Sequence, residues 1–359
     1  MVKLLIAAPQ HSFHIGGGAE IALVELVGYL KKKGVKCDFF DFSKSLKDYD
    51  LIYLHNIAQF PIEAYKIVSI ANTLGLKTIV NPTYWSSLEA LLECGQGIMK
   101  AAYMMAWFLL TFISKTGIDF GAESGYKYLR LALNESDRII VNSKSEAKLI
   151  SNFFSLNEEK IRVVYNGVSE DFCNSDPKYF VDTYGISDFI LYVGRIDPRK
   201  NILRLIKAFK KAKLDTDLVV IGKPDPYYQS YFQKCLSEAK NSENIHFLGH
   251  LTHDSVMLKS AYAASKVFVL PSFYETPGLA AMEAALAGAN VVITDRGATR
   301  EYFSKYAIYV DPGDLKSIAH GLMTAYYKPR STALRKHILN NFTWDKVSND
   351  FLKVLEELS

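Results

Sequence analysis

Cysteine is scarce in this chain. Its four residues, Cys37, Cys94, Cys173 and Cys235, lie far apart, and no two of them form a CxxC pair. Small secreted proteins depend on dense disulfide frameworks, and this spacing provides none. We therefore expect a reduced protein of the cytoplasm.

A strong excess of one charge is also absent. The formal net charge at pH 7 is +4, and no stripe of lysine and arginine runs along the chain. Such a stripe usually marks a nucleic-acid groove, so we expect no nucleic-acid partner. The mild positive excess suits an anionic small molecule or an anionic membrane surface.

No apolar run is long enough to span a membrane. Residues 98–114 come nearest, because Ala101–Ile113 carries no charge and is rich in Trp, Phe and Met. That run makes about 20 Å of helix, whereas a bilayer core needs about 30 Å. It is either a buried core helix or an interfacial helix that presents Trp107 and Phe108 to lipid. The interfacial alternative predicts peripheral contact with the cytosolic face of a membrane.

Short apolar runs alternate with helical stretches from end to end. One set of predicted strands extends from Lys3–Pro9 to Ile161–Tyr165, and a second from Phe189–Val193 to Ala307–Val310. The first run is read as a strand and not as a signal peptide, because no cleavage pattern follows it. Continuous apolar strands separated by helices are typical of parallel sheets covered on both faces.

At 359 residues the chain is too long for one compact core. We expect an α/β architecture of two doubly wound, Rossmann-like domains that face a central cleft, with ligands at the carboxyl ends of the strands. The predicted domains are 1–168 and 169–342. The remaining segment, 343–359, is expected to form a last helix, with a start signal at Thr343 and apolar residues at helical spacing.

The segment Pro271–Leu279 follows an apolar strand and leads into small apolar residues, which predicts a strand, a tight turn and a buried helix. Pro277 suits the start of a helix, and Gly278 lets a ligand approach the backbone closely. The N–H groups at that helix end suit a phosphate or a sugar hydroxyl. We expect Glu275, at the strand end, and Glu283, inside the helix, to face the same crevice. A buried carboxylate such as Glu283 needs hydrogen-bond donors, and a ribose diol would supply them.

Two further glycine turns follow predicted strands. After Gly194, Arg195 and Lys200 either flank one anionic site or mark a basic helix start. Arginine can hold two phosphate oxygens at once, while lysine acts as a point charge. Gly222 ends the next strand.

Near the N-terminus, the glycine run Gly16–Gly18 follows the first strand. It either opens a helix or forms a flexible loop.

These segments together resemble the retaining GT-B glycosyltransferases of family 4, also called glycosyl transferases group 1. Glu275 and Glu283 have the spacing of the E-x7-E signature of that family. Gly194–Asn201 resembles its Gly-Arg-Leu-x-x-x-Lys-Asn element. Gly17–Glu20 is similar to its Gly-Gly-Ala-Glu loop, and Asn166–Val168 looks like its Asn-Gly-Val element. The resemblance spans nearly the whole chain.

The resemblance implies a fold, a reaction and two substrates. The fold is GT-B, and the reaction moves a sugar, with retention, from a UDP-, GDP- or ADP-sugar to a glycan or a lipid-linked acceptor. No cofactor and no bound metal are implied. The N-terminal domain is expected to receive the acceptor, the C-terminal domain to bind the nucleotide sugar, and the terminal helix to cross back to the N-terminal domain.

The same resemblance implies roles for particular residues. Arg195 and Lys200 would hold the donor diphosphate, Glu275 the hydroxyls of the transferred sugar, and Glu283 the ribose. Glu275, Arg195 and Lys200 are then the expected catalytic residues. The other residues expected against the donor are Gly17, Gly18, Gly194, Gly222, His250, Thr276, Pro277, Gly278 and Leu279.

The chain departs from the family pattern at a few positions. Thr276 and Pro277 stand where the family usually has Gly and Phe, and Lys223 stands where it often has a second glycine. The family also commonly has a histidine after the fourth strand of the first domain, and this chain has none there. The side chains that approach the reacting sugar instead remain open among His11, His14, His55, Tyr84 and Trp85.

Three other functions were weighed. A dinucleotide-dependent dehydrogenase is disfavoured because Ile21 stands where its third glycine belongs. A GT-B epimerase needs acidic or histidine bases in the N-terminal half, where no clear pair is found. A non-catalytic nucleotide-sugar-binding partner of an active transferase remains an alternative. His246, His250 and His253 lack an acidic partner at recognisable spacing, so we expect no metal site.

Overall fold

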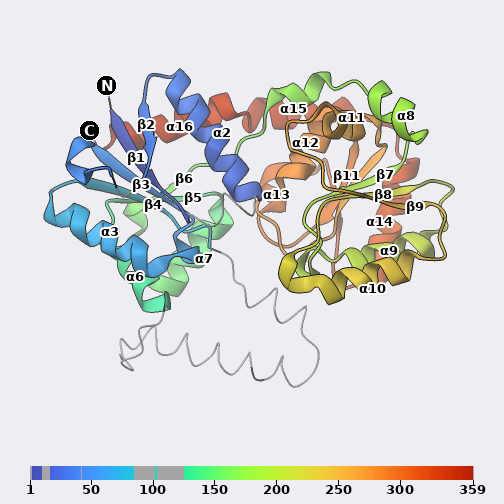
Figure 1. The fold of residues 1–359 in the computed structure, drawn as a ribbon, viewed down its shortest axis with the longest axis horizontal. Helices are drawn as coiled ribbons and strands as arrows, with labels where there is room; N and C mark the ends of the chain where they lie inside the picture. The colour runs from blue at the N-terminus through green and yellow to red at the C-terminus, as the bar shows by residue number, and fades with distance from the viewer. Residues whose placement is uncertain (1, 10–16, 42, 85–101, 103–124, 359) are drawn as a thin grey trace. The chain divides into compact units, whose positions relative to one another are not determined.

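The structure is a computed structural model that describes residues 2–9, 17–41, 43–84, 102 and 125–358. The chain divides into two compact units (Figure 1). Unit 1 contains the described residues up to Gly167 and those from Trp344 onward, and unit 2 contains Val168–Thr343. The chain leaves unit 1 after Gly167 and returns to it after Thr343, and each of these positions differs by one residue from the predicted boundary. The roles expected of the two units remain predictions.

Unit 1 is built on a six-stranded parallel sheet with the strand order β2-β1-β3-β4-β5-β6. Its central strands are almost wholly buried, which matches their continuous apolar sequences. Neighbours pair in parallel, for example Leu5 with Ile52. The strands are β1 (Lys3–Ala7), β2 (Lys36–Phe39), β3 (Leu51–His55), β4 (Lys77–Asn81), β5 (Arg138–Val141) and β6 (Ile161–Val163).

Helices cover both faces of this sheet (Figure 1). On one face α3 packs against α6, and on the other α2 packs against α16. The helices are α2 (Gly18–Lys32), α3 (Pro61–Thr73), α6 (Gly125–Glu135), α7 (Lys144–Phe154) and α16 (Trp344–Glu356), with short 3₁₀ turns η1 (Leu46–Asp48), η2 (Ile57–Gln59) and η3 (Glu158–Lys160).

The last helix, α16, belongs to unit 1 although it follows unit 2 in the sequence. Its buried residues are Trp344, Val347, Ser348, Phe351, Val354 and Leu355. Phe351 meets the ring of Tyr53 on β3 edge-on, with 5.0 Å between centroids. Lys33, at the end of α2, makes a 2.7 Å ion pair with Asp345. The predicted apolar stripe is therefore the surface that joins α16 to the first sheet.

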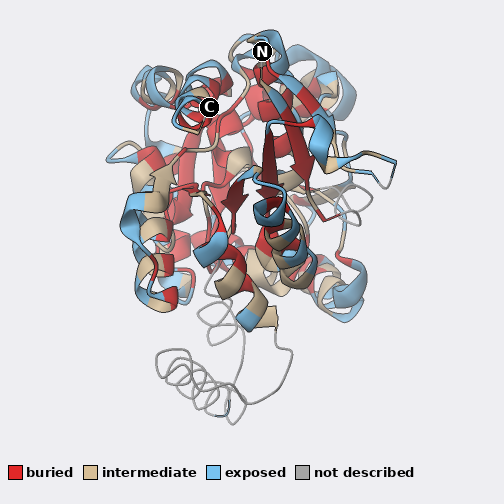
Figure 2. Cartoon of the chain, turned by 90° about the vertical axis from the view of Figure 1, so that its left-hand side faces the viewer, coloured by how far each residue is buried: buried red, intermediate tan, exposed pale blue. Residues whose placement is uncertain are grey.

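Unit 2 repeats the architecture with the strand order β12-β11-β10-β7-β8-β9. Strands β8, β10 and β11 are buried along their whole length. Figure 2 shows the chain coloured by burial, with strands mostly in the buried colour and helices that turn an exposed face outward. The strands are β7 (Ile190–Val193), β8 (Leu218–Ile221), β9 (Ile245–Gly249), β10 (Val267–Leu270), β11 (Asn290–Thr294) and β12 (Ile308–Val310). The predicted α/β class of two parallel, doubly wound sheets is confirmed.

The helices of unit 2 also form two layers (Figure 1). On one face α9 packs against α10 and α14, and on the other α11 and α12 pack against each other and against α8 and α15 respectively. The helices are α8 (Lys178–Tyr184), α9 (Ile202–Ala212), α10 (Gln229–Ala239), α11 (Val256–Ala264), α12 (Leu279–Ala287), α13 (Thr299–Phe303), α14 (Leu315–Tyr327) and α15 (Thr332–Asn341), with 3₁₀ turns η4 (Glu170–Asn174), η5 (Pro198–Lys200) and η6 (Pro226–Tyr228).

Among the described residues, no helix combines the length and the apolar character that crossing a membrane requires. The segment 98–114 lies outside the described residues, apart from Ala102. The choice between a core helix and an interfacial helix therefore stays a prediction.

Candidate active site

The candidate residues of unit 2 follow the carboxyl ends of its central strands. Gly194 and Arg195 follow β7, Gly222 follows β8, and Glu275 lies in the loop after β10. Strands β10, β7 and β8 are neighbours in the parallel sheet, so their carboxyl ends share one edge. The fold therefore brings these predicted residues to one edge, although they are far apart in the sequence.

The ends of β7 and β8 approach each other so closely that Gly222 leaves no room for a side chain. Gly194 and Gly222 have φ angles of +155° and +154°, which side chains rarely adopt. A Cβ on Gly222 would lie 1.9 Å from the carbonyl oxygen of Gly194. The Gly222 N–H also donates to the carbonyl of Gly249 at 2.7 Å. The glycines thus set a tight backbone edge beside Arg195.

Glu275 is a buried carboxylate held by two cations. Its side chain is 4% exposed, and its Oε1 is ion-paired with Lys200 Nζ and lies 3.7 Å from Arg199 Nη1. Burial alone would raise the pKa of Glu275, but the charges of Lys200 and Arg199 outweigh it and lower that pKa. Burial, with Arg199 nearby, lowers the pKa of Lys200. The Glu275 carboxylate is therefore compensated by two cations, while the charge of Asp197 also acts on Lys200.

Arg195 is paired with a different carboxylate. Its Nη1 lies 3.2 Å from Oδ2 of Asp225, and its side chain is 36% exposed. The other oxygen of Asp225 accepts from the N–H of Tyr227 at 2.9 Å. Asp225 therefore directs a partly exposed guanidinium at the strand edge. Neither Asp225 nor Arg199 was singled out from the sequence. Asp225 lies 30 residues from Arg195, and Arg199 lies 75 residues from Tyr274, whose carbonyl it meets.

The loop that carries Glu275 is fixed through its backbone as well. Gly297, after β11, pairs with Glu275 in a parallel bridge, and the N–H of Ala298 donates to the Glu275 carbonyl at 3.0 Å. A Cβ on Gly297, where φ is +90°, would lie 2.2 Å from that carbonyl oxygen. The contact therefore requires glycine, and the sequence analysis did not identify it.

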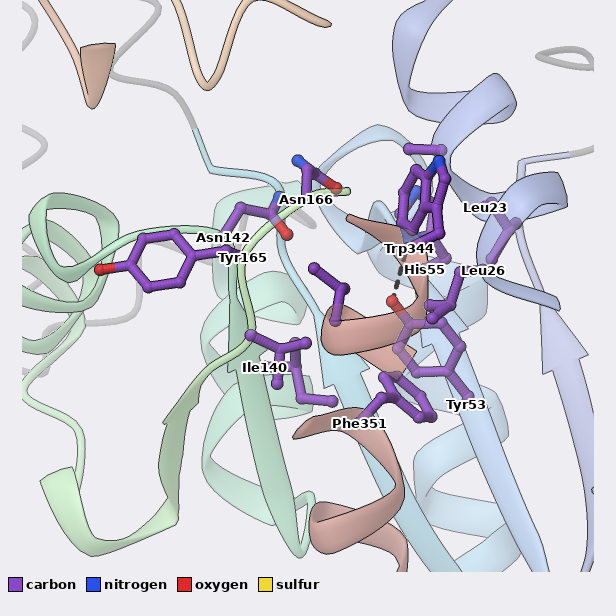
Figure 3. A pocket seen from close by; sticks show the side chains of 13 residues that line it. Leu23, Leu26, Tyr53, His55, Ile140, Asn142, Tyr165, Asn166, Trp344 and Phe351 are labelled. Carbon is purple, nitrogen blue, oxygen red and sulfur yellow. Dashed lines mark hydrogen bonds between the residues drawn. The ribbon is translucent and has the colours of Figure 1, made fainter. Parts of the chain in front are cut away.

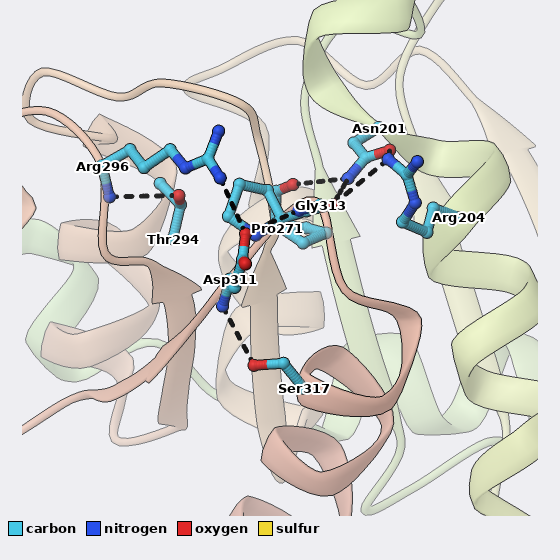
Figure 4. Close-up of polar contacts among 9 residues, drawn as sticks. Asn201, Arg204, Pro271, Thr294, Arg296, Asp311, Gly313 and Ser317 are labelled. Carbon is cyan, nitrogen blue, oxygen red and sulfur yellow. Dashed lines mark hydrogen bonds and ion pairs between the residues drawn. The ribbon is translucent and has the colours of Figure 1, made fainter. Parts of the chain in front are cut away.

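Asn201 joins three loops of the same edge (Figure 4). It is buried, with a left-handed φ of +63°. Its Nδ2 donates to the carbonyls of Pro271 at 3.0 Å and Pro312 at 2.9 Å, while its Oδ1 accepts from Arg204 at 3.1 Å. The loops after β7, β10 and β12 are thereby held together. In the sequence, Asn201 was visible only as the end of the Lys-Asn element.

Helix α12 begins later than predicted. Gly278, with φ +84°, is its N-cap residue, and the first helical residue is Leu279. The expectation that Pro277 starts the helix is wrong by two residues, because the left-handed backbone of Gly278 separates the proline from the helix. A Cβ on Gly278 would lie 3.1 Å from a methyl of Leu270. Thr276 and Pro277 lie in the turn before the cap, and the prediction of a buried helix holds.

Glu283 lies inside α12 and is 5% exposed. Both carboxylate oxygens accept hydrogen bonds from protein groups: Oε1 meets His253 Nε2 and Oε2 meets the Tyr262 hydroxyl, each at 2.7 Å.

The other candidate histidines of unit 2 lie apart from Glu283. His250, in the loop after β9, is exposed. His246 pairs with Asp217 at 2.7 Å. In the part of the chain that the structure describes, no group of three or more His, Cys, Asp or Glu residues could hold a metal ion.

In unit 1, Gly17 is the N-cap residue of α2 and Gly18 its first residue. The preceding Gly16 and the candidates His11, His14 and Trp85 lie outside the described residues.

Tyr84 is described, and its backbone N–H donates to Oε1 of a buried glutamate, Glu146, at 2.7 Å. Burial raises the pKa of Glu146 to about 7. Glu146 went unnoticed in the sequence, although Ser143-x-x-Glu146 is a capping-box pattern.

His55 ends β3 and is buried (Figure 3). Its Nδ1 is 3.0 Å from the hydroxyl of Tyr53, and its Nε2 makes no hydrogen bond of good geometry with the described residues. His55 lines a cavity of about 20 Å³ together with Asn142, Asn166 and Trp344, enough room for one water. Burial lowers the pKa of His55 to about 4, so the ring is neutral at pH 7.

Comparisons with known proteins agree with this arrangement. A crystal structure of HepE from Anabaena, in complex with UDP and glucose, has a TM-score of 0.72 and 16% identity and covers 99% of this chain and 100% of that one. The family model "Glycosyl transferases group 1" matches residues 183–341, and "Glycosyltransferase Family 4" matches residues 111–172. Residues 183–341 thus match the glycosyl transferases of group 1, and the chain has the GT-B fold. The first match lies within unit 2, which carries the paired Glu275 and Lys200.

Two similar curated proteins come from an archaeon and a bacterium. A Methanocaldococcus jannaschii protein named as a glycosyltransferase is 29% identical over 62% of this chain. A Clostridium botulinum glycogen synthase is 24% identical over 74% of this chain. The matches span 61% and 64% of the length of these relatives.

The Gly222 contact gives a stability prediction. Gly222→Ala should lower the free energy of unfolding by about 2 kcal/mol or more, because the new Cβ overlaps the Gly194 carbonyl in a backbone region that alanine avoids. Thermal unfolding measures this. The control is Gly28→Ala, in the exposed part of α2, where a Cβ meets nothing within 4 Å. It should be neutral or stabilising by about 0.5–1 kcal/mol. An unchanged melting temperature for Gly222→Ala would contradict the steric argument.

His55 predicts how stability depends on pH. The unfolded chain takes up a proton at this ring near pH 6.5, whereas the folded chain does so only near pH 4. This contribution to stability is fully present above pH 6.5 and falls by about 3 kcal/mol as the pH drops to 4. His55→Gln should flatten the decline in denaturant-measured stability over this window. The exposed His320→Gln variant is the control and should follow the parent. Parallel curves for His55→Gln and the parent would refute the assignment.

Proposed function

We propose that the protein transfers a sugar, with retention and without a bound metal, from a nucleoside-diphosphate sugar to a hydroxyl of a glycan or lipid-linked acceptor. The observation that carries this proposal is the buried Glu275 carboxylate, paired with Lys200 and near Arg199, at the carboxyl edge of a parallel sheet. The match of residues 183–341 to the glycosyl transferases of group 1, and the likeness of the motifs to that family, support it.

The leaving diphosphate needs positive partners. Arg195 is partly exposed at this edge, Lys200 lies beside Glu275, and the first N–H groups of α12 follow Gly278. A helix N-terminus and fixed cations stabilise charge that develops on a departing phosphate. We assign the diphosphate to these three groups.

The two carboxylates have separate tasks in the proposal. Glu275, kept ionised by its two cations, would accept hydrogen bonds from hydroxyls of the transferred sugar and steady positive charge at the anomeric carbon. Glu283, inside α12, would accept from the ribose. The Anabaena relative in complex with UDP and glucose supports UDP as the first base to test.

The acceptor is proposed to be a glycan or a lipid-linked sugar. The similarity to a glycogen synthase supports a glycan. The apolar segment 98–114 supports a membrane-proximal acceptor, with peripheral contact to the cytosolic face, although the segment lies outside the described residues. The scarcity of cysteine supports a cytoplasmic location.

The diphosphate assignment is tested by two substitutions. Arg195→Ala and Lys200→Ala should each lower turnover of the donor on the order of 10²-fold, the usual loss for one charge-stabilising donor. Release of nucleoside diphosphate from UDP-glucose, GDP-mannose and ADP-glucose measures this, and turnover by the parent also excludes the non-catalytic alternative. Lys211→Ala, on the exposed side of α9, should match the parent. Parental rates in both site variants would overturn the assignment.

The division between the carboxylates gives a second test. Glu283→Gln should weaken binding of the free nucleoside diphosphate, because the ribose loses an ionised acceptor. Glu275→Gln should leave that binding nearly intact and lower turnover, because its proposed partner is the sugar. Titration calorimetry with UDP, followed by donor turnover, separates the two. Equal losses of nucleotide affinity would reject the division.

A further inference from the structure

The carboxylate of Glu283 is fixed from two sides by residues of one chain segment. Tyr262 lies on α11, and His253 lies in the loop that precedes α11. The Tyr262 hydroxyl lies 2.7 Å from Oε2 and His253 Nε2 lies 2.7 Å from Oε1. Among the described residues, each carboxylate oxygen therefore accepts one side-chain hydrogen bond.

Both partners act as donors. An ionised carboxylate only accepts hydrogen bonds, so the hydroxyl and the ring nitrogen must each supply a proton. Burial, together with the charge of Glu283, raises the pKa of Tyr262 far above its ordinary value, and the hydroxyl keeps its proton at any working pH.

The two donors are themselves held in place. Tyr262 is fully buried, and Phe172 packs against both rings, with centroids 5.6 Å from Tyr262 and 5.7 Å from His253. The Tyr262 ring also lies 5.9 Å from that of Phe268 on β10. The orientation of the Glu283 carboxylate is thus set by a packed aromatic cluster and not by the glutamate alone.

A carboxylate oxygen has two lone pairs, and here one pair on each oxygen is used by the protein. The remaining pairs, one on each oxygen, suit two neighbouring hydroxyl groups. Acceptance from two hydroxyls at once requires that the carboxylate does not rotate, and the Tyr262 and His253 hydrogen bonds oppose that rotation. A group fixed before the ligand arrives loses less freedom on binding.

We propose that Tyr262 and His253 are positioning residues that hold Glu283 for two-point recognition of a vicinal diol, the 2′ and 3′ hydroxyls of a nucleoside diphosphate. This inference rests on the proposed function, in which Glu283 binds the ribose. It adds that discrimination between ribose and deoxyribose depends on two residues that do not touch the ligand.

The experiment measures the ratio of dissociation constants for the deoxy and ribo forms of one nucleotide. Titration calorimetry uses UDP with 2′-deoxy-UDP, and the corresponding pairs of GDP and ADP. The parent should prefer the ribonucleotide by roughly tenfold or more, because the deoxy form leaves a buried lone pair without a partner. Tyr262→Phe keeps the ring packing but removes the donor, and its ratio should fall to about threefold or less.

Two variants of His253 make the test specific. His253→Phe removes the donor and should lower the ratio, while His253→Gln restores an N–H donor and should recover most of it. Tyr326→Phe, on α14, is the matched control, since the Tyr326 hydroxyl donates to the carbonyl of Asp215 and not to Glu283. It should keep the parental ratio. Thermal unfolding of each variant shows that the fold is retained.

The outcomes distinguish this inference from the function on which it rests. If the parent discriminates but Tyr262→Phe and His253→Phe keep its ratio, the positioning role is refuted and the proposed function stands. If the control Tyr326→Phe also loses discrimination, the effect is not specific and the inference fails. If the parent binds ribo and deoxy forms equally, or binds none of the nucleotides, the ribose assignment of Glu283 fails and the inference fails with it.

Discussion

The ion pair between Glu275 and Lys200 is the contact on which the arrangement of this edge of unit 2 depends. Glu275 is buried and Lys200 is partly buried, and removal of the lysine would leave the buried carboxylate without its nearest compensating charge. The pair joins the turn after β7 to the loop after β10. The bridge between Glu275 and Gly297 attaches the loop after β11, and the hydrogen bond from Asn201 to Pro312 attaches the loop after β12. Four strand ends are therefore fixed around one carboxylate.

Close backbone approach is the second constraint at this edge. Gly194, Gly222 and Gly297 each have positive φ angles, and a side chain on Gly222 or Gly297 would overlap a backbone oxygen. Beside this backbone, the Arg195 side chain remains partly exposed. The site thus combines rigid backbone with cations whose carboxylate partners hold them in place, an arrangement suited to an anionic leaving group.

The corresponding edge of unit 1 is built from different chemistry. Its buried polar groups include the carboxamides of Asn81 and Asn142, the neutral ring of His55, and Glu146, whose pKa near 7 favours a partly protonated carboxyl. Uncharged donors and acceptors suit hydroxyl groups better than phosphates. This contrast supports the proposed division, with the anionic donor at unit 2 and a hydroxyl-bearing acceptor at unit 1.

The sequence by itself determined the strands, their parallel class and the main motif residues, because apolar periodicity and glycine turns are local properties. Its boundaries for the two units lay within one residue, since polar links interrupt apolar runs. Tertiary structure alone decided which groups meet. Arg199, Asp225, Asn201, Gly297 and Tyr262 acquire their roles from partners 15 or more residues away, which no local pattern encodes. The start of α12 was also decided by tertiary structure. Gly278 adopts its left-handed conformation where it lies against Leu270 on β10 and Ile293 on β11.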